Sequence, residues 1–129
     1  MIKLTNEKIL LLHKIMIEST GGSGEVRDFA LLDSAVNGIY ATFDGSYLYP
    51  SKEEKAAKLG FSLISNHAFV DGNKRIGIYA MMTFLEINGI PIDCTNEELA
   101  KLGLGIADGR YNHKHILDWI NKHKKCTNF

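Results

Sequence analysis

The chain has 129 residues, 45% of them hydrophobic and 23% charged, with 15 acidic and 15 basic side chains. This size fits a single domain with one core, spanning 1–129, and the zero net charge argues against a dedicated nucleic-acid binder. No apolar run approaches the roughly 20 residues that cross a bilayer, and the N-terminus shows no signal-peptide pattern. Cys94 and Cys126 lack framework or zinc-ligand spacing. We therefore expect a cytoplasmic protein with two free thiols, no structural zinc and no membrane partner.

Apolar residues recur at helical spacing along most of the chain, and capping residues mark where helices begin. The first helix begins after Thr5 or Asn6, and the glycine-rich stretch 20–24 breaks the pattern behind it. Capping-box patterns precede two later helices, Ser51 with Glu54 and Thr95 with Glu98. The expected helices cover about residues 6–19, 29–38, 52–66, 73–88, 96–107 and 113–122. The fourth is apolar nearly all round, which predicts burial at the centre of a bundle.

One segment, about 40–50, departs from the helical pattern. Asp44-Gly45 is a hairpin-type turn signal with aromatic and β-favouring residues on both sides. A two-stranded hairpin is marginally stable alone, so we expect a flap lying on a helical body. The predicted fold is therefore all-α: a single-domain bundle of about six helices with a short β-hairpin flap.

The loop 67–75 joins the third and fourth expected helices and reads His-Ala-Phe-Val-Asp-Gly-Asn-Lys-Arg. His67 is either a cap that complements the helix dipole or a general base with a pKa suited to neutral pH. Asp71 is either a turn or cap residue or the single carboxylate of a Mg²⁺ site completed by phosphate oxygens. Phe69 is expected to anchor the loop in the core and to aim His67 outward.

Four residues, Gly72, Asn73, Lys74 and Arg75, form the turn into the fourth expected helix. Glycine allows close approach of a ligand, and the N–H groups of a first helical turn lack partners within the helix. Asn73 either caps the helix or binds a phosphate oxygen. Two cations at a helix N-terminus cost about 0.3–1 kcal/mol each. We therefore predict an anionic ligand, a phosphate group, at this turn.

These nine residues resemble the signature of the Fic/Doc superfamily, H-x-F-x-[D/E]-G-N-G-R-x-x-R, and specifically its Doc (death-on-curing) branch, in which lysine stands at the position of Lys74. Further stretches look Doc-like in the right order, so that the resemblance covers nearly the whole chain. They are 24–28, 31–35, 48–50 and 84–89. The sequence departs from the family at Gly72, where Doc proteins often carry alanine, and at Ile78, where the second Fic arginine would fall.

The resemblance implies a small helical bundle with a flap, in which His67 is the general base on a target hydroxyl and Asp71 binds Mg²⁺ on the phosphates of ATP. It implies that the anion turn is Gly72, Asn73, Lys74 and Arg75. The flap would dock an extended target segment by strand addition. Its residues are Thr42, Phe43, Asp44, Gly45, Ser46, Tyr47 and Leu48.

The expected activity is that of a Doc-like toxin, which phosphorylates a Ser/Thr hydroxyl of a protein, suspected to be a translation factor, and inhibits growth. Lys74 favours transfer of the γ-phosphate over AMP transfer, which stays as the alternative. A catalytically silent nucleotide-binding or peptide-binding module is the other alternative. No [S/T]-x-x-x-E-[G/N] inhibitory segment occurs in the sequence, so an antitoxin-like protein is expected to act in trans.

The run 122–125, Lys-His-Lys-Lys, is the one basic cluster near the C-terminus. A frayed and solvated tail is the simpler interpretation of such a run. We therefore expect no direct nucleic-acid binding.

Overall fold

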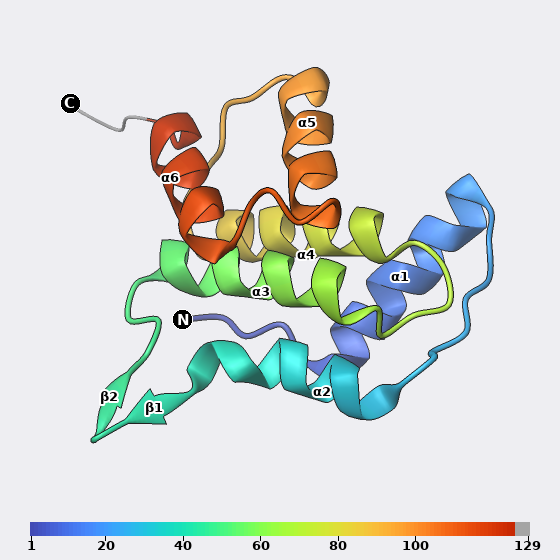
Figure 1. Cartoon of the computed structure of the whole chain (residues 1–129), viewed down its shortest axis with the longest axis horizontal. Coiled ribbons are helices and arrows are strands. Elements are labelled where there is room, and N and C mark those ends of the chain that lie inside the picture. The colour runs from blue at the N-terminus through green and yellow to red at the C-terminus, as the bar shows by residue number, and fades with distance from the viewer. Residues whose placement is uncertain (126–129) are drawn as a thin grey trace.

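The structure is a computed structural model that describes residues 1–125. These residues form six α-helices, one 3-10 turn and one two-stranded hairpin (Figure 1). The elements in order are α1 (Asn6–Thr20), α2 (Phe29–Asn37), η1 (Gly38–Tyr40), β1 (Thr42–Phe43), β2 (Ser46–Tyr47), α3 (Lys52–Asn66), α4 (Asn73–Ile87), α5 (Asn96–Ala107) and α6 (His113–His123). The predicted all-α bundle with a hairpin is confirmed. Cys94 is a free thiol as expected, and Cys126 lies outside the described residues.

Helix starts follow the local capping signals closely. The Thr5 side chain accepts a hydrogen bond from the N–H of Lys8 and begins α1. Thr95 and Glu98 form the complete capping box predicted for α5. At α3 the prediction is half wrong: Ser51 accepts from the N–H of Glu54, but among the described residues no side-chain bond returns from Glu54 to Ser51.

The helices α3 and α4 form an antiparallel pair at the centre of the molecule, and two glycines let them approach closely. A Cβ atom on Gly77 would lie 2.4 Å from Cγ1 of Ile64 and 3.0 Å from the carbonyl oxygen of Gly60. The inner face of α4 is fully buried, with Ala80 at 0% exposure. The predicted central position of α4 is confirmed, but its burial is incomplete, because the apolar side chain of Tyr79 is 45% exposed.

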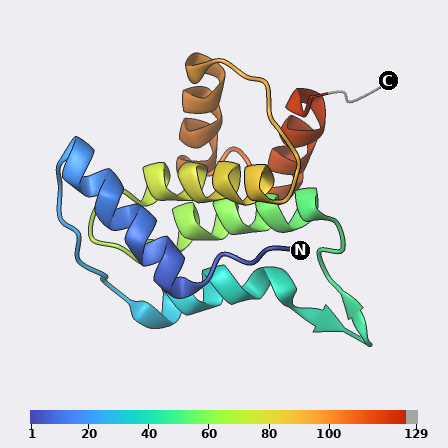
Figure 2. The same ribbon diagram turned by 180° about the vertical axis from the view of Figure 1, so that it is seen from behind.

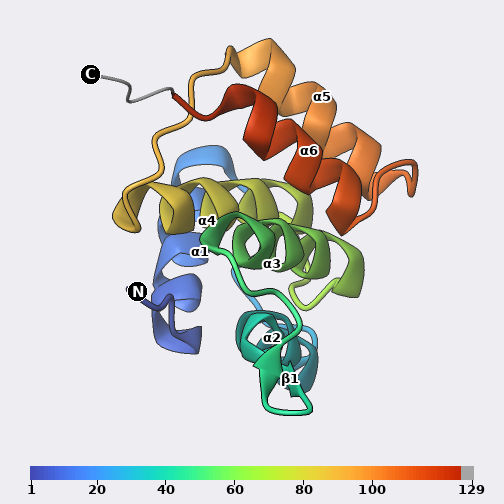
Figure 3. The same cartoon turned by 90° about the vertical axis from the view of Figure 1, so that its left-hand side faces the viewer.

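The remaining helices cover this pair from two sides. Seen end-on, α5 and α6 lie on one side of α3 and α4, and α1 and α2 lie on the other (Figure 3). The side chain of Asn88 ties the N-terminal segment to the end of α4, accepting from the N–H of Ile2 at 2.7 Å and donating to its carbonyl at 3.0 Å. No described helix combines the length and apolar character needed to span a membrane.

The predicted hairpin is present and projects from the body. Thr42 pairs with Tyr47, and Phe43 pairs with Ser46, around a turn that contains Asp44. Asp44 and the glycine after it both have positive φ, 54° and 80°. The side chains of both hairpin strands are exposed, with Phe43 at 75%.

A buried lysine anchors the stem of the hairpin on α3. Lys55 is only 1% exposed, and its ammonium donates to the carbonyls of Tyr49 and Pro50. The same ammonium lies 4.2 Å from the centre of the Tyr47 ring. Burial lowers the pKa of Lys55.

Tertiary contacts order the described part of the basic run at the C-terminus, so the expected fraying is wrong there, although Lys122, Lys124 and Lys125 are exposed as expected. The ammonium of Lys124 binds the carboxylate of Glu53 at 2.9 Å, and its backbone forms a bridge with Ile92. The N–H of Lys125 donates to the carbonyl of Pro91 at 2.9 Å. Segments distant in sequence therefore hold residues 124–125 in place.

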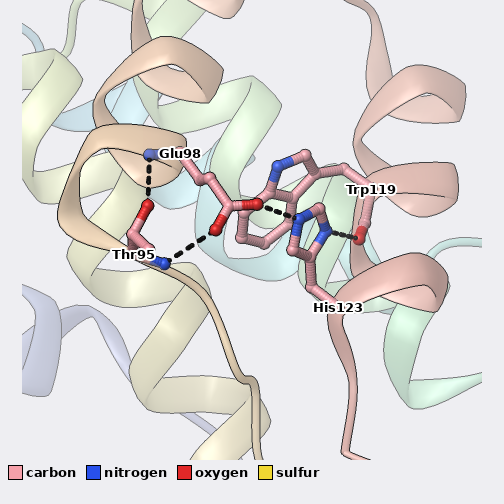
Figure 4. Close-up of polar contacts among 4 residues, drawn as sticks. All are labelled: Thr95, Glu98, Trp119 and His123. Carbon is pink, nitrogen blue, oxygen red and sulfur yellow. Dashed lines mark hydrogen bonds and ion pairs between the residues drawn. The ribbon is translucent and has the colours of Figure 1, made fainter.

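His123 of α6 makes two hydrogen bonds, one within its own helix and one that joins α6 to α5 (Figure 4). Nδ1 of His123 lies 2.7 Å from the carbonyl oxygen of Trp119, and Nε2 lies 2.8 Å from Oε2 of Glu98. Both partners are acceptors, so both bonds form together only when the ring is protonated. The bond to Trp119 and then the bond to Glu98 raise the pKa of His123. The Thr95 N–H and then His123 lower the pKa of Glu98.

This pair predicts a pH-dependent contribution to stability. The raised pKa of His123 means that its contribution is complete below its ordinary value of 6.5 and is lost as pH rises through the folded-state pKa. The lowered pKa of Glu98 means that its contribution is present above 4.5 and is lost on acidification. The Tm difference between wild type and His123→Gln should therefore be larger near about pH 5.5 than near about pH 8.5.

Thermal unfolding followed by circular dichroism at the two pH values measures this difference. Glu97→Gln is the matched control, because Glu97 lies beside Glu98 on α5 and, within residues 1–125, makes only an exposed pair with Lys101. A Tm difference for His123→Gln that is equal at both pH values would contradict the assignment.

Candidate active site

The loop between α3 and α4 begins with His67 in an unusual backbone conformation. His67 caps the C-terminus of α3 with φ 52° and ψ 49°, the left-handed region that a residue with a Cβ rarely adopts. A strained backbone conformation of this kind occurs where surrounding contacts hold the residue in place, and such residues cluster at functional sites. The His67 side chain is exposed. An exposed imidazole on a constrained backbone suits a general base.

An arginine from outside the loop holds the backbone at this position. Arg27 donates from Nε to the carbonyl of His67 at 2.6 Å and from a terminal nitrogen to the carbonyl of Asn66 at 3.1 Å. The last carbonyls of a helix lack partners within it, and the guanidinium supplies one here. The backbone of the candidate base is therefore positioned by a residue 40 places earlier in the chain.

The segment around Arg27 also pairs with the loop through its backbone. The N–H groups of Arg27 and Asp28 both donate to the carbonyl of Ala68, at 2.8 and 3.0 Å. The N–H of Val70 donates to the carbonyl of Glu25 at 3.0 Å. This segment and the end of α1 flank the loop in Figure 2. The loop is thus braced along its length by residues that precede α2.

Phe69 anchors the loop in the core, as predicted. It is 1% exposed, and its ring stacks on His13 of α1 with centroids 3.7 Å apart. The Asn73 side chain closes the loop around Phe69, accepting from its N–H at 3.0 Å and donating to its carbonyl at 2.9 Å. Since both ends of the Asn73 amide are engaged, an anion at this turn would meet the backbone N–H of Asn73.

Asp71 lies exposed next to the glycine-rich segment after α1. Its Oδ2 atom accepts from the N–H of Ser23 at 2.8 Å, which uses one of its two oxygens. A Cβ atom on Gly22 would lie 3.3 Å from Cβ of Asp71, so glycine gives the carboxylate room. Magnesium takes one or two carboxylates with phosphate oxygens and water, so a single Asp fits such an ion. Among the described residues, no cluster of three or more His, Cys, Asp or Glu side chains suits a metal ion.

The turn into α4 has the conformation of an anion site. Gly72 is left-handed with φ 78°, and no side chain in the described part of the chain caps the helix there. A Cβ atom at this position would lie 2.8 Å from Cε of Met16, so the turn sits directly against α1. The first-turn N–H groups and the helix dipole face any ligand at this end.

The two cations of the turn are placed differently. Arg75 is half-buried and donates to the hydroxyl of Thr20 at the end of α1. Lys74 is exposed, and its stem lies along α5, where a Cβ atom on Gly103 would be 3.4 Å from its Cγ. The stem of Lys74 therefore lies in close reach of Gly103 on α5.

A cavity of about 560 Å³ opens beside these cations, between α4, α5 and the end of α1. Its walls are mostly apolar, and Ile78 lines it at the position of the second Fic arginine. The lining residues are Met16, Lys74, Arg75, Ile78, Tyr79, Met82, Asn96, Leu99, Ala100, Gly103 and Leu104. The sequence did not indicate this cavity, because its walls come from three separate helices.

The hairpin is not brought together with the loop. The hairpin precedes the N-terminus of α3, whereas the loop that begins with His67 follows its C-terminus. In Figure 1 the hairpin and this loop lie at opposite ends of α3. The 15 residues of α3 span about 22 Å. Docking of a target on the residues 42–48 stays a prediction, and a docked segment would have to extend along α3 to present a hydroxyl at His67.

Sequence reasoning missed two residues that shape the loop, Arg27 and His13. Arg27 lies within a stretch that looks Doc-like, but nothing in the local pattern indicates that its guanidinium binds the helix end. His13 lies at an apolar-face position of α1 and is 1% exposed. The one signal available in the sequence was a histidine at an apolar-face position of an amphipathic helix.

Comparison with known proteins gives the family. Residues 3–85, more than half of the chain, match the model of the Fic/DOC family. The chain therefore belongs to the Fic/DOC family. It is also 51% identical over 72 residues to the Toxin Doc of Mycolicibacterium smegmatis, a match that covers 56% of this chain and 55% of that protein. The match thus spans about half the length of this curated relative, and it agrees with the Doc branch that the motif indicates.

The closure of the loop by Asn73 can be tested directly. Asn73→Ala removes two hydrogen bonds to the backbone of Phe69, and it should lower the free energy of unfolding by about 1–3 kcal/mol. Urea unfolding measures the loss. Asn121→Ala, at an exposed position of α6, is the control and should change stability by less than about 0.5 kcal/mol. Equal losses in the two variants would show that the Asn73 amide does not close the loop.

Proposed function

We propose that this protein is a toxin-type transferase that phosphorylates a Ser or Thr hydroxyl of a protein target with ATP. The observation that carries the proposal is the placement of an exposed histidine and an uncapped helix N-terminus in one braced loop. The histidine supplies a base, and the helix N-terminus supplies a phosphate site. Membership of the Fic/DOC family and similarity to a protein named Toxin Doc support it.

In this proposal His67 takes the proton of the target hydroxyl as its oxygen attacks the γ-phosphorus of ATP. The new bond joins that oxygen to the γ-phosphorus, and the bond from the γ-phosphorus to the β–γ bridging oxygen breaks. ADP leaves with the bonding electrons. The proton passes from His67 to solvent, so that the products are a phosphoester, ADP and one proton.

The turn at Gly72 would stabilise the negative charge of the phosphates. Backbone N–H groups of the first turn of α4 donate to phosphate oxygens, and the helix dipole and Arg75 add attraction. Asp71 is the residue that would hold Mg²⁺, which when bound neutralises part of the phosphate charge. The unfavourable placement of cations at a helix N-terminus is offset once the anion is present.

Lys74 bears on which phosphorus is attacked. In AMP transfer, the alternative chemistry, the hydroxyl attacks the α-phosphorus and pyrophosphate leaves. Lysine at this position favours γ-transfer by the Doc resemblance. The stem of Lys74 lies beside Gly103 on α5, and Lys74 lines the cavity next to the turn.

The cavity next to the turn is the proposed site for the nucleoside. Small-molecule sites are mostly apolar with a few polar groups that fix orientation, and they typically measure about 300–1,000 Å³. This cavity of about 560 Å³ has Lys74 and Arg75 in its wall. If the phosphates of ATP bind at the turn, the adenine would therefore lie among apolar side chains such as Leu99 and Leu104.

The suspected target is a translation factor, and the hairpin residues 42–48 remain the proposed docking element. We also propose that a separate antitoxin-like protein restrains the activity, because the relative is named as a toxin. Co-expression of the toxin with the product of a neighbouring gene should then restore growth. Continued growth arrest in the presence of that product, expressed in soluble form, would exclude it as the antitoxin.

Labelled ATP tests the reaction. Purified protein incubated with purified translation factors and ATP labelled on the γ-phosphate should transfer label to one factor, and ATP labelled on the α-phosphate should not. Label from the α-phosphate alone would refute the kinase assignment and support AMP transfer. No transfer from either nucleotide would favour the silent binding module.

His67→Ala should abolish both label transfer and growth inhibition on induced expression. The reason is that the target hydroxyl then has no base, and general-base catalysis contributes about 10²–10⁴-fold. Asn121→Ala serves as the control for expression and folding. Unchanged growth inhibition by His67→Ala would overturn the enzymatic assignment.

The nucleoside cavity is tested by filling it. Ala100→Phe places a ring at an exposed position of α5 that lines the cavity, and it should raise the KM for ATP about tenfold. Inhibition by tripolyphosphate, which has no base, should stay unchanged. Ala107→Phe is the matched control on the same helix outside the cavity lining. An unchanged KM for ATP in the Ala100→Phe variant would show that the adenine of ATP binds outside this cavity.

A further inference from the structure

A buried histidine to which the proposed reaction gives no role contacts the anion turn from behind. His13 lies on α1 and is 1% exposed. Its Nε2 atom lies 2.8 Å from the carbonyl oxygen of Asp71. Its ring stacks on Phe69 at an interplanar angle of 12°. This stacking fixes the plane of the imidazole, in which the hydrogen bond to Asp71 lies.

The hydrogen bond has a defined direction. A carbonyl oxygen only accepts, so Nε2 of His13 carries the hydrogen and donates it. The carbonyl of Asp71 belongs to the same planar peptide as the N–H of Gly72, and in a trans peptide the two point in opposite directions. Because His13 draws the carbonyl toward α1, the N–H of Gly72 points away from α1.

The next residues extend this orientation into an anion site. Gly72 is left-handed, and Asn73 begins α4 in the right-handed conformation. Successive N–H groups in such a pair of conformations form a concave anion-binding nest. The nest depends on the peptide before Gly72 keeping its orientation. A flip of that peptide would present the carbonyl oxygen of Asp71 to the anion in place of an N–H.

We propose that His13 is a positioning residue for phosphate binding, which orients the Asp71–Gly72 peptide so that the N–H of Gly72 donates to a nucleotide phosphate. This role rests on the proposed function, since it assumes that a polyphosphate occupies the turn. Other contacts brace the loop on either side of this peptide, through Asn73 and Ser23. Among the described residues, His13 is the side chain that binds the Asp71 carbonyl.

Three substitutions separate this role from packing. His13→Gln keeps an N–H donor at nearly the distance of Nε2 from the backbone. His13→Asn is one methylene shorter and cannot bridge to the Asp71 carbonyl from the same backbone position. His13→Leu fills the space beside Phe69 but has no donor, so that the carbonyl is left unpaired. Gln and Asn both bury an amide, which makes them a matched pair.

Calorimetry with tripolyphosphate as the probe measures the effect without a nucleoside or a target. We expect His13→Asn and His13→Leu to bind tripolyphosphate about tenfold or more weakly, and His13→Gln to stay within about threefold of wild type. Tm values measured alongside identify any unfolded variant. Equal affinities in the folded variants would overturn the proposal, and so would an equal loss in the Asn and Gln variants.

A second readout distinguishes failure of this inference from failure of the proposed function. If wild type does not bind tripolyphosphate or ATP, the phosphate site itself is refuted. In that case the NMR chemical shift of the Gly72 backbone amide still reports the orientation of the Asp71–Gly72 peptide. This chemical shift should match wild type in His13→Gln and differ from it in His13→Asn and His13→Leu. An unchanged Gly72 resonance in all three variants would show that His13 does not orient the peptide.

Discussion

The close contact between α3 and α4 is the constraint on which the site depends. At Gly77 no side chain larger than hydrogen fits against Ile64 and Gly60. This contact holds the end of one helix and the start of the next at a fixed separation. A short loop must then join them, and it does so with left-handed backbone at His67 and Gly72. The conformation of the loop is therefore a consequence of helix packing as well as of its own residues.

The loop stays in this conformation because other segments bind its polar groups. Arg27 satisfies carbonyls at the end of α3, His13 takes the Asp71 carbonyl, and the Asn73 amide closes around Phe69. With these groups satisfied inside the protein, the first turn of α4 is left facing outward without a cap. An uncapped helix N-terminus flanked by cations is costly without an anion, and this is the physical basis of the phosphate site that we propose.

Much of the architecture was predictable from local patterns. Capping residues such as Thr5 and Thr95 placed helix starts, because a cap acts within one turn of its own helix. The turn signal at Asp44 placed the hairpin, because a tight turn likewise depends only on neighbouring residues. The predictions failed where distant segments decide. The tail at Lys124 is ordered by Glu53, and Tyr79 on the apolar α4 is exposed, because it borders the open cavity between α4 and α5.

By itself, the sequence determined the order and type of the elements and the nine residues of the family motif, since these depend on short-range periodicity and on a contiguous pattern. Tertiary structure alone decided which residues support that motif and what lies beside it. Arg27 and His13 are 40 and 58 residues from their partners in the loop. The cavity beside Lys74 needs three helices to enclose it, and the hairpin is separated from His67 by the length of α3. Such relations arise only when helices pack, because residues distant in the chain then meet at distances that no local pattern encodes.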